Sequence, residues 1–219
     1  MATKTKKDPD AYEESVDNKL IETGDSCQDA ASDLEVELGA PGGESLQQEQ
    51  LLDSIGEAQR ALDRFLGNQF ESARAMMEPL AETSMYHSLG CSTIYYMQAS
   101  MTLEQPDIQR AVLATKRALR VCQRYRRPRN GLAMAAPLLL RLADFTDEQC
   151  HAELCYAELL LEKAVLTFAQ DESLMAFVRG GLKIRDCHRA YRLCWRLLRK
   201  RAWSCAELRM HFESGARCA

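Results

Sequence analysis

Apolar residues recur at spacings of three and four along most of the chain from about residue 48, which is the periodicity of an amphipathic α-helix. The first such stripe runs from Leu51 to Leu66. Gly67-Asn68 then predicts a helix C-terminus, because both residues accept the left-handed backbone conformation. The periodicity resumes at Phe70, so the pattern predicts a tight antiparallel pair of helices.

A second helical pair is predicted between about residues 84 and 122. Ser84 is a suitable N-cap for a stripe that continues to Leu103. Pro106 suits the first turn of the next helix, whose apolar face runs from Ile108 to Cys122. The pattern again predicts two antiparallel helices.

Two longer helices are predicted in the C-terminal half. Thr146-Asp-Glu-Gln149 has the pattern of a capping box, and the helix that follows is apolar on several sides, so we expect it to be the most buried. A further stripe runs from Leu174 to Ala202 and contains Gly180-Gly181. Adjacent glycines predict either a bend or a close helix crossing where side chains would not fit.

The fold class predicted is therefore all-α, with antiparallel helical hairpins stacked in an array. Residues 46–203 form this helical domain, and residues 125–145 are a connection within it, because Pro128, Gly131 and Pro137 break helix. Residues 1–50 carry thirteen acidic side chains against four lysines, and residues 1–45 are predicted to be a disordered acidic tail. Residues 204–219 are predicted to be a basic, poorly ordered extension.

Composition narrows the classes of function. No apolar run reaches the roughly 20 residues of a membrane span, and no secretory signal segment is visible. We therefore expect a cytoplasmic or nuclear location. The nine cysteines contain no Cys-x-x-Cys pair, and most lie within helical patterns, which favours reduced packing thiols over a zinc site or disulfides.

Short helical hairpins in series, with a Leu-Gly-Asn-Gln-Phe-Glu-Ser-Ala turn at 66–73, are similar to tetratricopeptide repeats. More specific are Ala61-Leu-Asp-Arg-Phe-Leu66, Asn68-Gln-Phe70, Thr83-Ser-Met-Tyr-His-Ser-Leu89, Cys155-Tyr-Ala-Glu158 and Gly180-Gly-Leu-Lys-Ile-Arg185. Over roughly residues 50–192 these segments closely resemble the N-terminal part of the vertebrate tetratricopeptide repeat protein thirty-nine family. We expect the resemblance to fade after about Tyr191, as in a truncated or alternatively spliced form.

The resemblance implies a tetratricopeptide-like array without catalysis, whose relatives are linked to lipid homeostasis, to cilia and, in fungi, to inclusion-body clearance. The leading hypothesis is a non-catalytic scaffold or adaptor that binds other proteins. The alternative is a peripheral membrane or lipid-droplet protein that uses the basic amphipathic segment after residue 183 for weak contact with anionic lipid. A third hypothesis is an isoform that competes for the partners of a longer form.

Two basic regions supply the candidate partner-binding residues. A stripe of arginines leads into the connection after residue 125, and a cationic amphipathic segment covers residues 183–203. A solvated face is the ordinary explanation of such a stripe, with an acidic peptide, a phosphate group or RNA as alternatives. Nucleic acid is not expected, because few aromatic residues interleave with the cations. The candidates are Arg117, Arg120, Arg124, Arg127, Trp195, Arg196 and Trp203.

The second basic segment is predicted to cap the stack with its first half and to be under-packed after about Trp195. His151 and Cys155 lie four residues apart and suggest a metal or nucleophile site, but no second cluster supplies further ligands. Glu153, Glu158 and Glu162 suggest a di-iron helix bundle, but none of them begins the Glu-x-x-His pattern that such a site needs on two helices. We therefore predict no enzyme activity and no cofactor.

Overall fold

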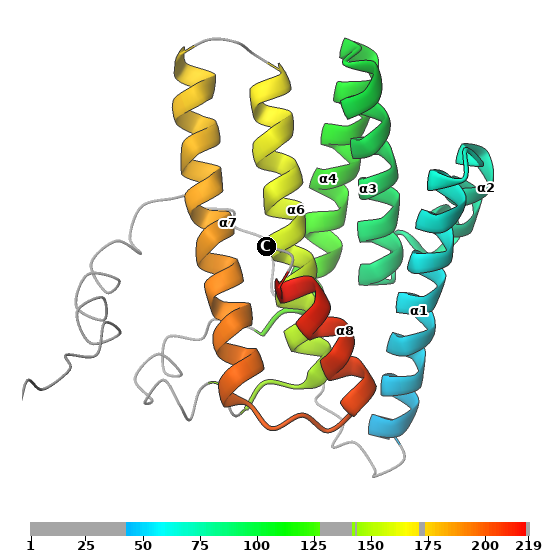
Figure 1. Ribbon diagram of the computed structural model, residues 1–219, viewed down its shortest axis with the longest axis vertical. Helices are drawn as coiled ribbons and strands as arrows, with labels where there is room; N and C mark the ends of the chain where they lie inside the picture. Colours follow the sequence, from blue (N-terminus) through cyan, green and yellow to red (C-terminus); the bar gives the residue numbers. More distant parts are fainter. Residues whose placement is uncertain (1–42, 128–141, 143, 171–173, 218–219) are drawn as a thin grey trace, which may run out of the picture. The chain divides into compact units, whose positions relative to one another are not determined.

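Figure 1 shows the computed structural model of the chain, which describes residues 43–127, 142, 144–170 and 174–217. Within these residues the secondary structure is helical and contains no strand, which confirms the predicted all-α class. The elements are α1 (Gly43–Leu66), α2 (Phe70–Met77), the short 3-10 helix η2 (Glu78–Leu80), α3 (Met85–Thr102), α4 (Gln105–Tyr125), α6 (Asp147–Gln170), α7 (Leu174–Lys200) and α8 (Ala206–Arg217). The predicted tail up to residue 42 and the connection at 128–141 lie outside the described residues.

The first helix ends where its sequence predicts. Asn68 adopts a φ of 64°, in the left-handed region. The amide of Gly67 donates to the Asp63 carbonyl at 2.9 Å, and that of Gln69 donates to the Arg64 carbonyl at 2.9 Å. These bonds satisfy carbonyls that a helix C-terminus would otherwise leave unpaired. α2 then packs back against α1, with Phe65 and Phe70 meeting edge to face at 4.9 Å between ring centroids.

Predicted capping residues also begin α3 and α6. The Ser84 hydroxyl accepts from the His87 amide at the start of α3, and Pro106 lies in the first turn of α4. Before α6, the Thr146 amide donates to Gln149 Oε1 at 3.3 Å, and the Gln149 amide donates to Thr146 Oγ1 at 3.1 Å. This reciprocal pair confirms the capping box.

α6 is the central helix of the described unit. It lies between α4 and α7 (Figure 1) and also packs against α3 and α8. It carries more buried residues than any other described helix, as its apolar sequence predicts. None of the described helices is long and apolar enough to cross a membrane.

α7 runs without interruption past Gly180-Gly181. A Cβ atom added to Gly180 would lie 2.4 Å from Cζ of Phe168 on α6, whereas one added to Gly181 would meet nothing within 4 Å. Of the two alternatives that the sequence left open, Gly180 therefore marks a close helix crossing.

The C-terminal residues differ most from the prediction. Residues 204–219 were expected to be poorly ordered, yet Ala206–Arg217 form α8, whose Leu208 and Phe212 are both fully buried. The end of α7 is also packed, with Leu197 and Leu198 buried, so the expected under-packing after Trp195 is wrong. α8 returns across α6 and α7 and covers apolar residues on both, which extends the helical unit beyond residue 203.

Cysteines fill much of the core, as predicted. The seven cysteines of the described residues are free thiols. Cys122, Cys155 and Cys187 pack in one large apolar cluster, and Cys150 and Cys194 pack in the cluster beneath α8. Burial raises the pKa of the Cys150 thiol to about 12, so this group stays protonated and behaves as a small hydrophobe.

Candidate functional site

Most of the candidate arginines on α4 and just after its end form ion pairs and hydrogen bonds with other groups of this chain. Arg117 Nε lies 3.1 Å from Glu82 Oε1, and Arg124 donates to the Glu82 carbonyl at 3.0 Å. Arg127 lies 3.3 Å from Asp144 and has its guanidinium 5.4 Å from the centroid of the Phe145 ring. Arg120 is exposed and has no ion pair with any residue that the structure describes. The stripe is therefore a solvated face with part of its charge neutralised.

Arg126, which is not among the candidate residues, is the deepest cation of this region. Its Nε and Nη2 atoms donate to the two carboxylate oxygens of Glu153, each at 2.9 Å. Its guanidinium lies 3.7 Å from the centroid of the Tyr156 ring. This bidentate pair joins the end of α4 to α6. The one sequence signal for it is an acidic residue, Glu153, within the helix that the sequence predicts to be the most buried.

The other candidates lie apart from these arginines. Trp195 and Arg196 lie on α7, with Trp195 exposed and Arg196 half-buried. Trp203 lies between α7 and α8, and its ring centroid is 4.9 Å from that of Phe212 and 6.2 Å from that of His151. Trp203 is therefore part of the packing that holds α8. Because α6 separates α4 from α7, the structure does not bring the two groups of candidates together.

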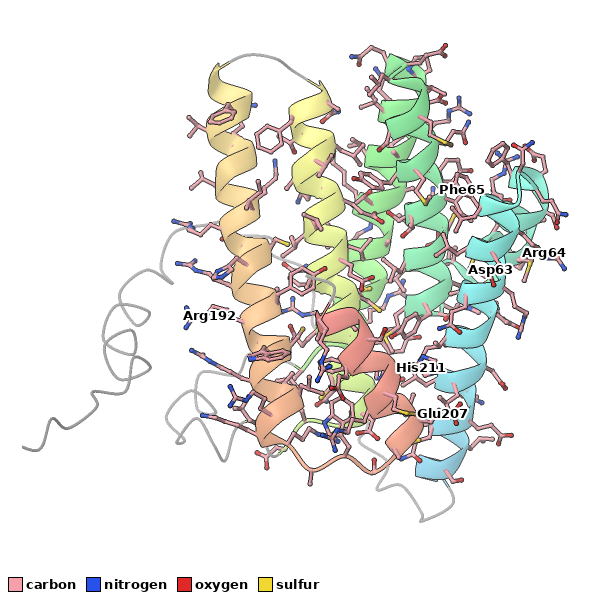
Figure 2. The ribbon with its side chains drawn as sticks, viewed as in Figure 1. Asp63, Arg64, Phe65, Arg192, Glu207 and His211 are labelled. Carbon is pink, nitrogen blue, oxygen red and sulfur yellow. The ribbon has the colours of Figure 1, made fainter. Side chains whose placement is uncertain are left out.

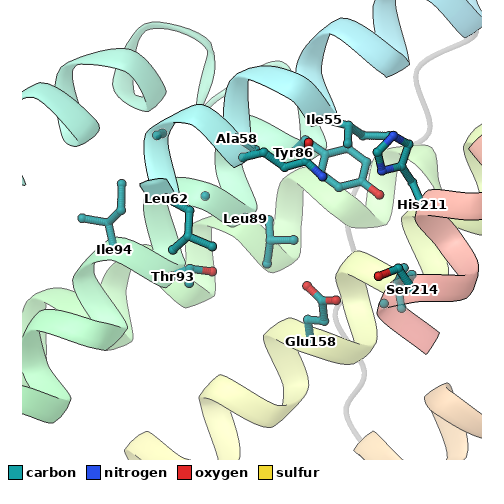
Figure 3. A pocket seen from close by; sticks show the side chains of 15 residues that line it. Ile55, Ala58, Leu62, Tyr86, Leu89, Thr93, Ile94, Glu158, His211 and Ser214 are labelled. Atoms are coloured by element: carbon teal, nitrogen blue, oxygen red, sulfur yellow. The ribbon is translucent and has the colours of Figure 1, made fainter. Parts of the chain in front are cut away.

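The structure instead reveals a cavity of about 280 Å³ between α1, α3, α6 and α8 (Figure 3). Figure 2 shows His211 on the side of α8 that faces α1, where it contributes to the wall. The volume exceeds the roughly 150 Å³ that holds a benzene molecule. Leu62 and Ser214 line the cavity and are exposed, so it opens to solvent between α1 and α8. The apolar lining consists of Ile55, Ala58, Ala61, Leu62, Leu89, Gly90, Ile94, Leu154 and Gly215.

Glu158 of α6 is the carboxylate that lines this cavity. Burial and repulsion from Glu162 raise the pKa of the Glu158 carboxyl to about 7. Glu162, one turn further along α6, accepts from the Ser92 hydroxyl at 2.5 Å and from the Thr93 hydroxyl at 2.7 Å. Glu158 has no ion pair or hydrogen bond with any described residue. Of these two acids, Glu158 is half-buried and lines the cavity, whereas Glu162 is buried and bonded to α3.

Tyr86, which also lines the cavity, joins three helices through His151. The Tyr86 hydroxyl lies 2.6 Å from His151 Nδ1, and His151 Nε2 lies 3.0 Å from the Leu208 carbonyl of α8. A carbonyl only accepts, so Nε2 carries the proton and Nδ1 accepts from the tyrosine. Burial lowers the pKa of His151 to about 4, which keeps the ring neutral.

Both ring nitrogens of His151 are thus committed to protein partners. Within the described residues no group of three or more histidine, cysteine, aspartate or glutamate side chains could hold a metal ion. The proximity of His151 and Cys155 on α6 reflects packing between helices, with both side chains buried.

Asp147 holds the segment that leads into α8, the fourth wall of the cavity. Its carboxylate pairs with the Arg201 guanidinium, accepts from the Ser204 hydroxyl at 2.5 Å and accepts from the Cys205 amide at 3.2 Å. The side chains of Asp147 and Arg201 are 4% and 7% exposed. These contacts set where α8 begins, and therefore which of its residues face α1.

A profile of the Iml2/Tetratricopeptide repeat protein 39 family matches residues 59–218. The chain is also similar to tetratricopeptide repeat protein ttc-39B of Caenorhabditis elegans, with 37% identity over 171 residues. That match covers 77% of this chain and 30% of the relative, so the chain spans under a third of that protein's length. No solved structure matches the chain.

The family match includes α8, which corrects the expectation that the resemblance fades near Tyr191. A family of the tetratricopeptide type suggests a protein-interaction scaffold. On the extent of this match, the chain belongs to the Iml2/Tetratricopeptide repeat protein 39 family.

Proposed function

We propose that this chain is a non-catalytic scaffold that binds a polypeptide partner over the cavity between α1 and α8. Membership of a tetratricopeptide-type family supports a protein partner. The observation that carries the proposal is the cavity itself, whose apolar walls come from four helices and whose rim is open. Ligand sites in proteins are concave, largely apolar and furnished with a few polar groups, as this cavity is.

A partner would bind by inserting one large side chain between α1 and α8. Full burial of an aliphatic or aromatic side chain contributes about 1.5–3 kcal/mol. Interfaces concentrate their binding energy in such anchors, which fill well-packed pockets. The exposed side chains at the rim, Gln59, Leu62 and Ser214, would then contact the partner's backbone and neighbouring residues.

Comparative cross-linking tests this surface. A photoreactive residue at position 214 should cross-link to a polypeptide, and Leu62→Arg should abolish the cross-link. Leu113→Arg is the matched control, because Leu113 is an apolar residue on α4 that is also exposed. Equal cross-linking by the Leu62 and Leu113 variants would contradict the proposal.

The arginines of α4 remain a separate hypothesis, in which they contact acidic residues of the partner. Arg120 is the residue to test, because it has no ion pair within the described residues. Arg120→Glu should weaken capture of the same polypeptide, and more so at low ionic strength. Unchanged capture at all salt concentrations would remove the stripe from the binding surface.

Contact with an anionic membrane is a second candidate, which one observation favours. The N-terminal half of α7 exposes Phe177, Val178, Leu182 and Ile184 among the cations Arg179, Lys183 and Arg185. In the C-terminal half, by contrast, Leu197 and Leu198 are buried, so the anchor would lie nearer the start of α7 than the sequence suggested. A role in lipid homeostasis, which the family resemblance implies, would be compatible with such contact.

Flotation with vesicles that contain anionic lipid separates the two candidates. A membrane role requires that the double variant Phe177→Glu and Leu182→Glu lose flotation while Leu113→Glu retains it. The scaffold proposal requires no flotation by any of these proteins. We prefer the scaffold, because the cavity combines concave shape with specific polar groups.

A further inference from the structure

We infer that the cavity between α1 and α8 selects a ligand with an apolar stem and a terminal protonated amine, with the Glu158 carboxylate as its counter-ion. The inference rests on the proposed function in using the same cavity, and it adds the chemistry of the occupant. The amine has two possible sources, a free alkyl or arylalkyl amine and the side chain of a partner's lysine. Both present the same group to Glu158.

The first argument is that Glu158 faces the cavity without a partner. A Cβ atom added to Gly215 of α8 would lie 3.4 Å from Glu158 Oε1 and 2.7 Å from Leu154 Cδ2. The glycine therefore lets the α8 backbone pass close to the carboxylate, with no side chain at position 215 to fill the space beside it. Figure 3 shows the Glu158 side chain and Ser214 at the same cavity. Within the described residues no cation approaches Glu158 closely enough to form an ion pair.

The second argument is that the polar groups around the cavity suit an ammonium group. An ammonium has three donors and no acceptor, so it needs a carboxylate and neutral acceptors. Thr93 and Ser214 supply hydroxyl oxygens in the lining. The Thr93 hydroxyl donates its hydrogen to Glu162 at 2.7 Å, which leaves its oxygen free to accept. An anionic ligand would instead meet the Glu158 carboxyl in the lining, with Glu162 one turn away on α6.

The third argument is size and polarity. A volume of about 280 Å³ corresponds to roughly ten non-hydrogen atoms, in proportion to the cavity of about 150 Å³ that holds benzene. A six-carbon chain or a phenylalkyl group with one amine meets this limit. The apolar stem would lie against Ile55, Leu62 and Leu89, which line the wall towards α1 and α3.

The protonation of Glu158 gives binding a characteristic pH dependence. Its pKa of about 7 means that much of the free protein carries a neutral carboxyl near neutrality, and a bound cation favours the charged form. Binding should therefore release a proton and tighten as the pH rises from 6 to 8. The other titratable groups near Glu158 are Glu162 and Cys155 on α6, Tyr86 on α3, Tyr191 and Cys194 on α7, and His211 on α8.

The two phenols among these groups do not titrate in this range, because burial raises the pKa of both Tyr86 and Tyr191. Burial also raises the pKa of the Glu162 carboxyl to about 7, so Glu162 titrates in the same range as Glu158. The pH dependence of binding should therefore persist in Glu162→Gln and in His211→Asn, and it should be much smaller in Glu158→Gln.

The direct test compares hexylammonium with 1-hexanol, which has the same stem and no charge, by NMR titration of the full chain at pH 8. Hexylammonium is expected to bind at least about tenfold more tightly, a difference of about 1.4 kcal/mol. Glu158→Gln should reduce this ratio to near one. Glu213→Gln is the matched control, because Glu213 lies next to Ser214 and pairs with Arg217 instead of lining the cavity. Equal binding of the two ligands, or binding of neither, overturns the inference.

A second test places the amine on the protein. Ser214→Lys supplies an alkylammonium from the cavity rim, and Ser214→Met supplies a neutral chain of similar length. The lysine variant should have the higher melting temperature at pH 8, and Glu158→Gln should abolish that difference. The inference fails if the lysine and methionine variants are equally stable in the wild-type background.

The source of the amine is decided by a third ligand, lysine blocked as its N-acetyl amide. If the natural ligand is a partner's lysine, the blocked lysine should bind at least as tightly as hexylammonium. If it is a free amine, hexylammonium should bind more tightly than the blocked lysine. The two proposals can fail separately. If hexylammonium and 1-hexanol bind equally while Leu62→Arg still abolishes cross-linking, the scaffold proposal stands and the amine inference fails. If hexylammonium is preferred but no polypeptide is cross-linked, the cavity is a small-molecule site.

Discussion

The adjacent glycines of α7 allow a sharp test of helix packing, because alanine at the two positions should have opposite effects. Both residues lie within α7. At Gly180 an added Cβ would lie 2.4, 2.5 and 2.9 Å from Cζ, Cε1 and Cε2 of the Phe168 ring. At Gly181 it would meet no atom within 4 Å. The two substitutions therefore share the same chemistry and differ only in what the new methyl group meets.

The expected changes in the free energy of unfolding follow from helix propensity and from the steric overlap between the new methyl group and the Phe168 ring. Glycine is less favourable than alanine inside a helix by about 0.8–1 kcal/mol, so Gly181→Ala should raise the free energy of unfolding by about 0.5–1 kcal/mol. Gly180→Ala has the same favourable change in helix propensity, but it forces the Phe168 ring to move. Overpacking of this kind costs about 1–3 kcal/mol. The ring also pairs with Phe177 at 5.7 Å between centroids. We expect the two variants to differ by about 1–3 kcal/mol.

Urea unfolding followed by circular dichroism measures this difference, provided that the slopes of the transitions agree. In a chain of this size each kcal/mol corresponds to roughly 2–4 °C in melting temperature. Phe168→Ala is the decisive second substitution, because it removes the ring that the new methyl group would strike. In that background Gly180→Ala should stabilise the protein as Gly181→Ala does. Equal stability of the two single variants, or the absence of this rescue, would refute the close crossing.

Three further predictions concern α8 and the buried acids. Phe212→Ala, which empties a fully buried site, should lower the free energy of unfolding by about 3–5 kcal/mol in urea titrations, whereas exposed Met210→Ala should change it little. Asp147→Asn should cost about 3–5 kcal/mol by leaving the Arg201 guanidinium buried without its counter-ion, and a much smaller loss in the Arg201→Met background would identify that cause. The pKa of Glu158 is raised from 4.5 to about 7, so the folded protein favours the protonated acid. The contribution of this group to the free energy of unfolding is therefore fully present below pH 4.5 and is lost as the pH rises through 7. Glu158→Gln should therefore be more stable than the wild type at pH 8, by up to about 3 kcal/mol, and similar to it at pH 4.5; a difference that is the same at both pH values would contradict the raised pKa.

α8 links the stability of the unit to the proposed site. Its apolar face is buried under α6 and α7 through Leu208 and Phe212, while His211 and Ser214 face the cavity. Loss of α8 docking would therefore remove one wall of the cavity. Variants that weaken docking, such as Asp147→Asn, should also weaken binding of hexylammonium, and this distinguishes them from Glu213→Gln.

The helix ends could be predicted because their interactions are local. Gly67-Asn68, Ser84 and the pair Thr146 and Gln149 each act on backbone groups within a few residues of themselves. The apolar faces of the helices could also be predicted from the sequence, since a helix brings residues three and four apart onto one face. These features established an all-α chain of paired helices.

The cavity and the role of each charged residue depend instead on residues far apart in the chain. The choice of Arg126 over Arg127 as the buried cation depends on Glu153, 27 residues away, and the docking of α8 depends on a bond between His151 and Leu208, 57 residues apart. Glu158 and Glu162 look alike in sequence, yet only Glu162 meets hydroxyl donors from α3.

The sequence by itself thus determined which segments between about residues 48 and 202 are helical, where the first of them end and which faces are apolar, since neighbouring residues settle those features. Only the tertiary structure decided that α8 is part of the packed unit, that Gly180 is a crossing point and that Glu158 is left unpaired in a cavity. The physical reason is that burial, ion pairing and pKa depend on which helices meet, and that pairing is set by packing across the whole unit.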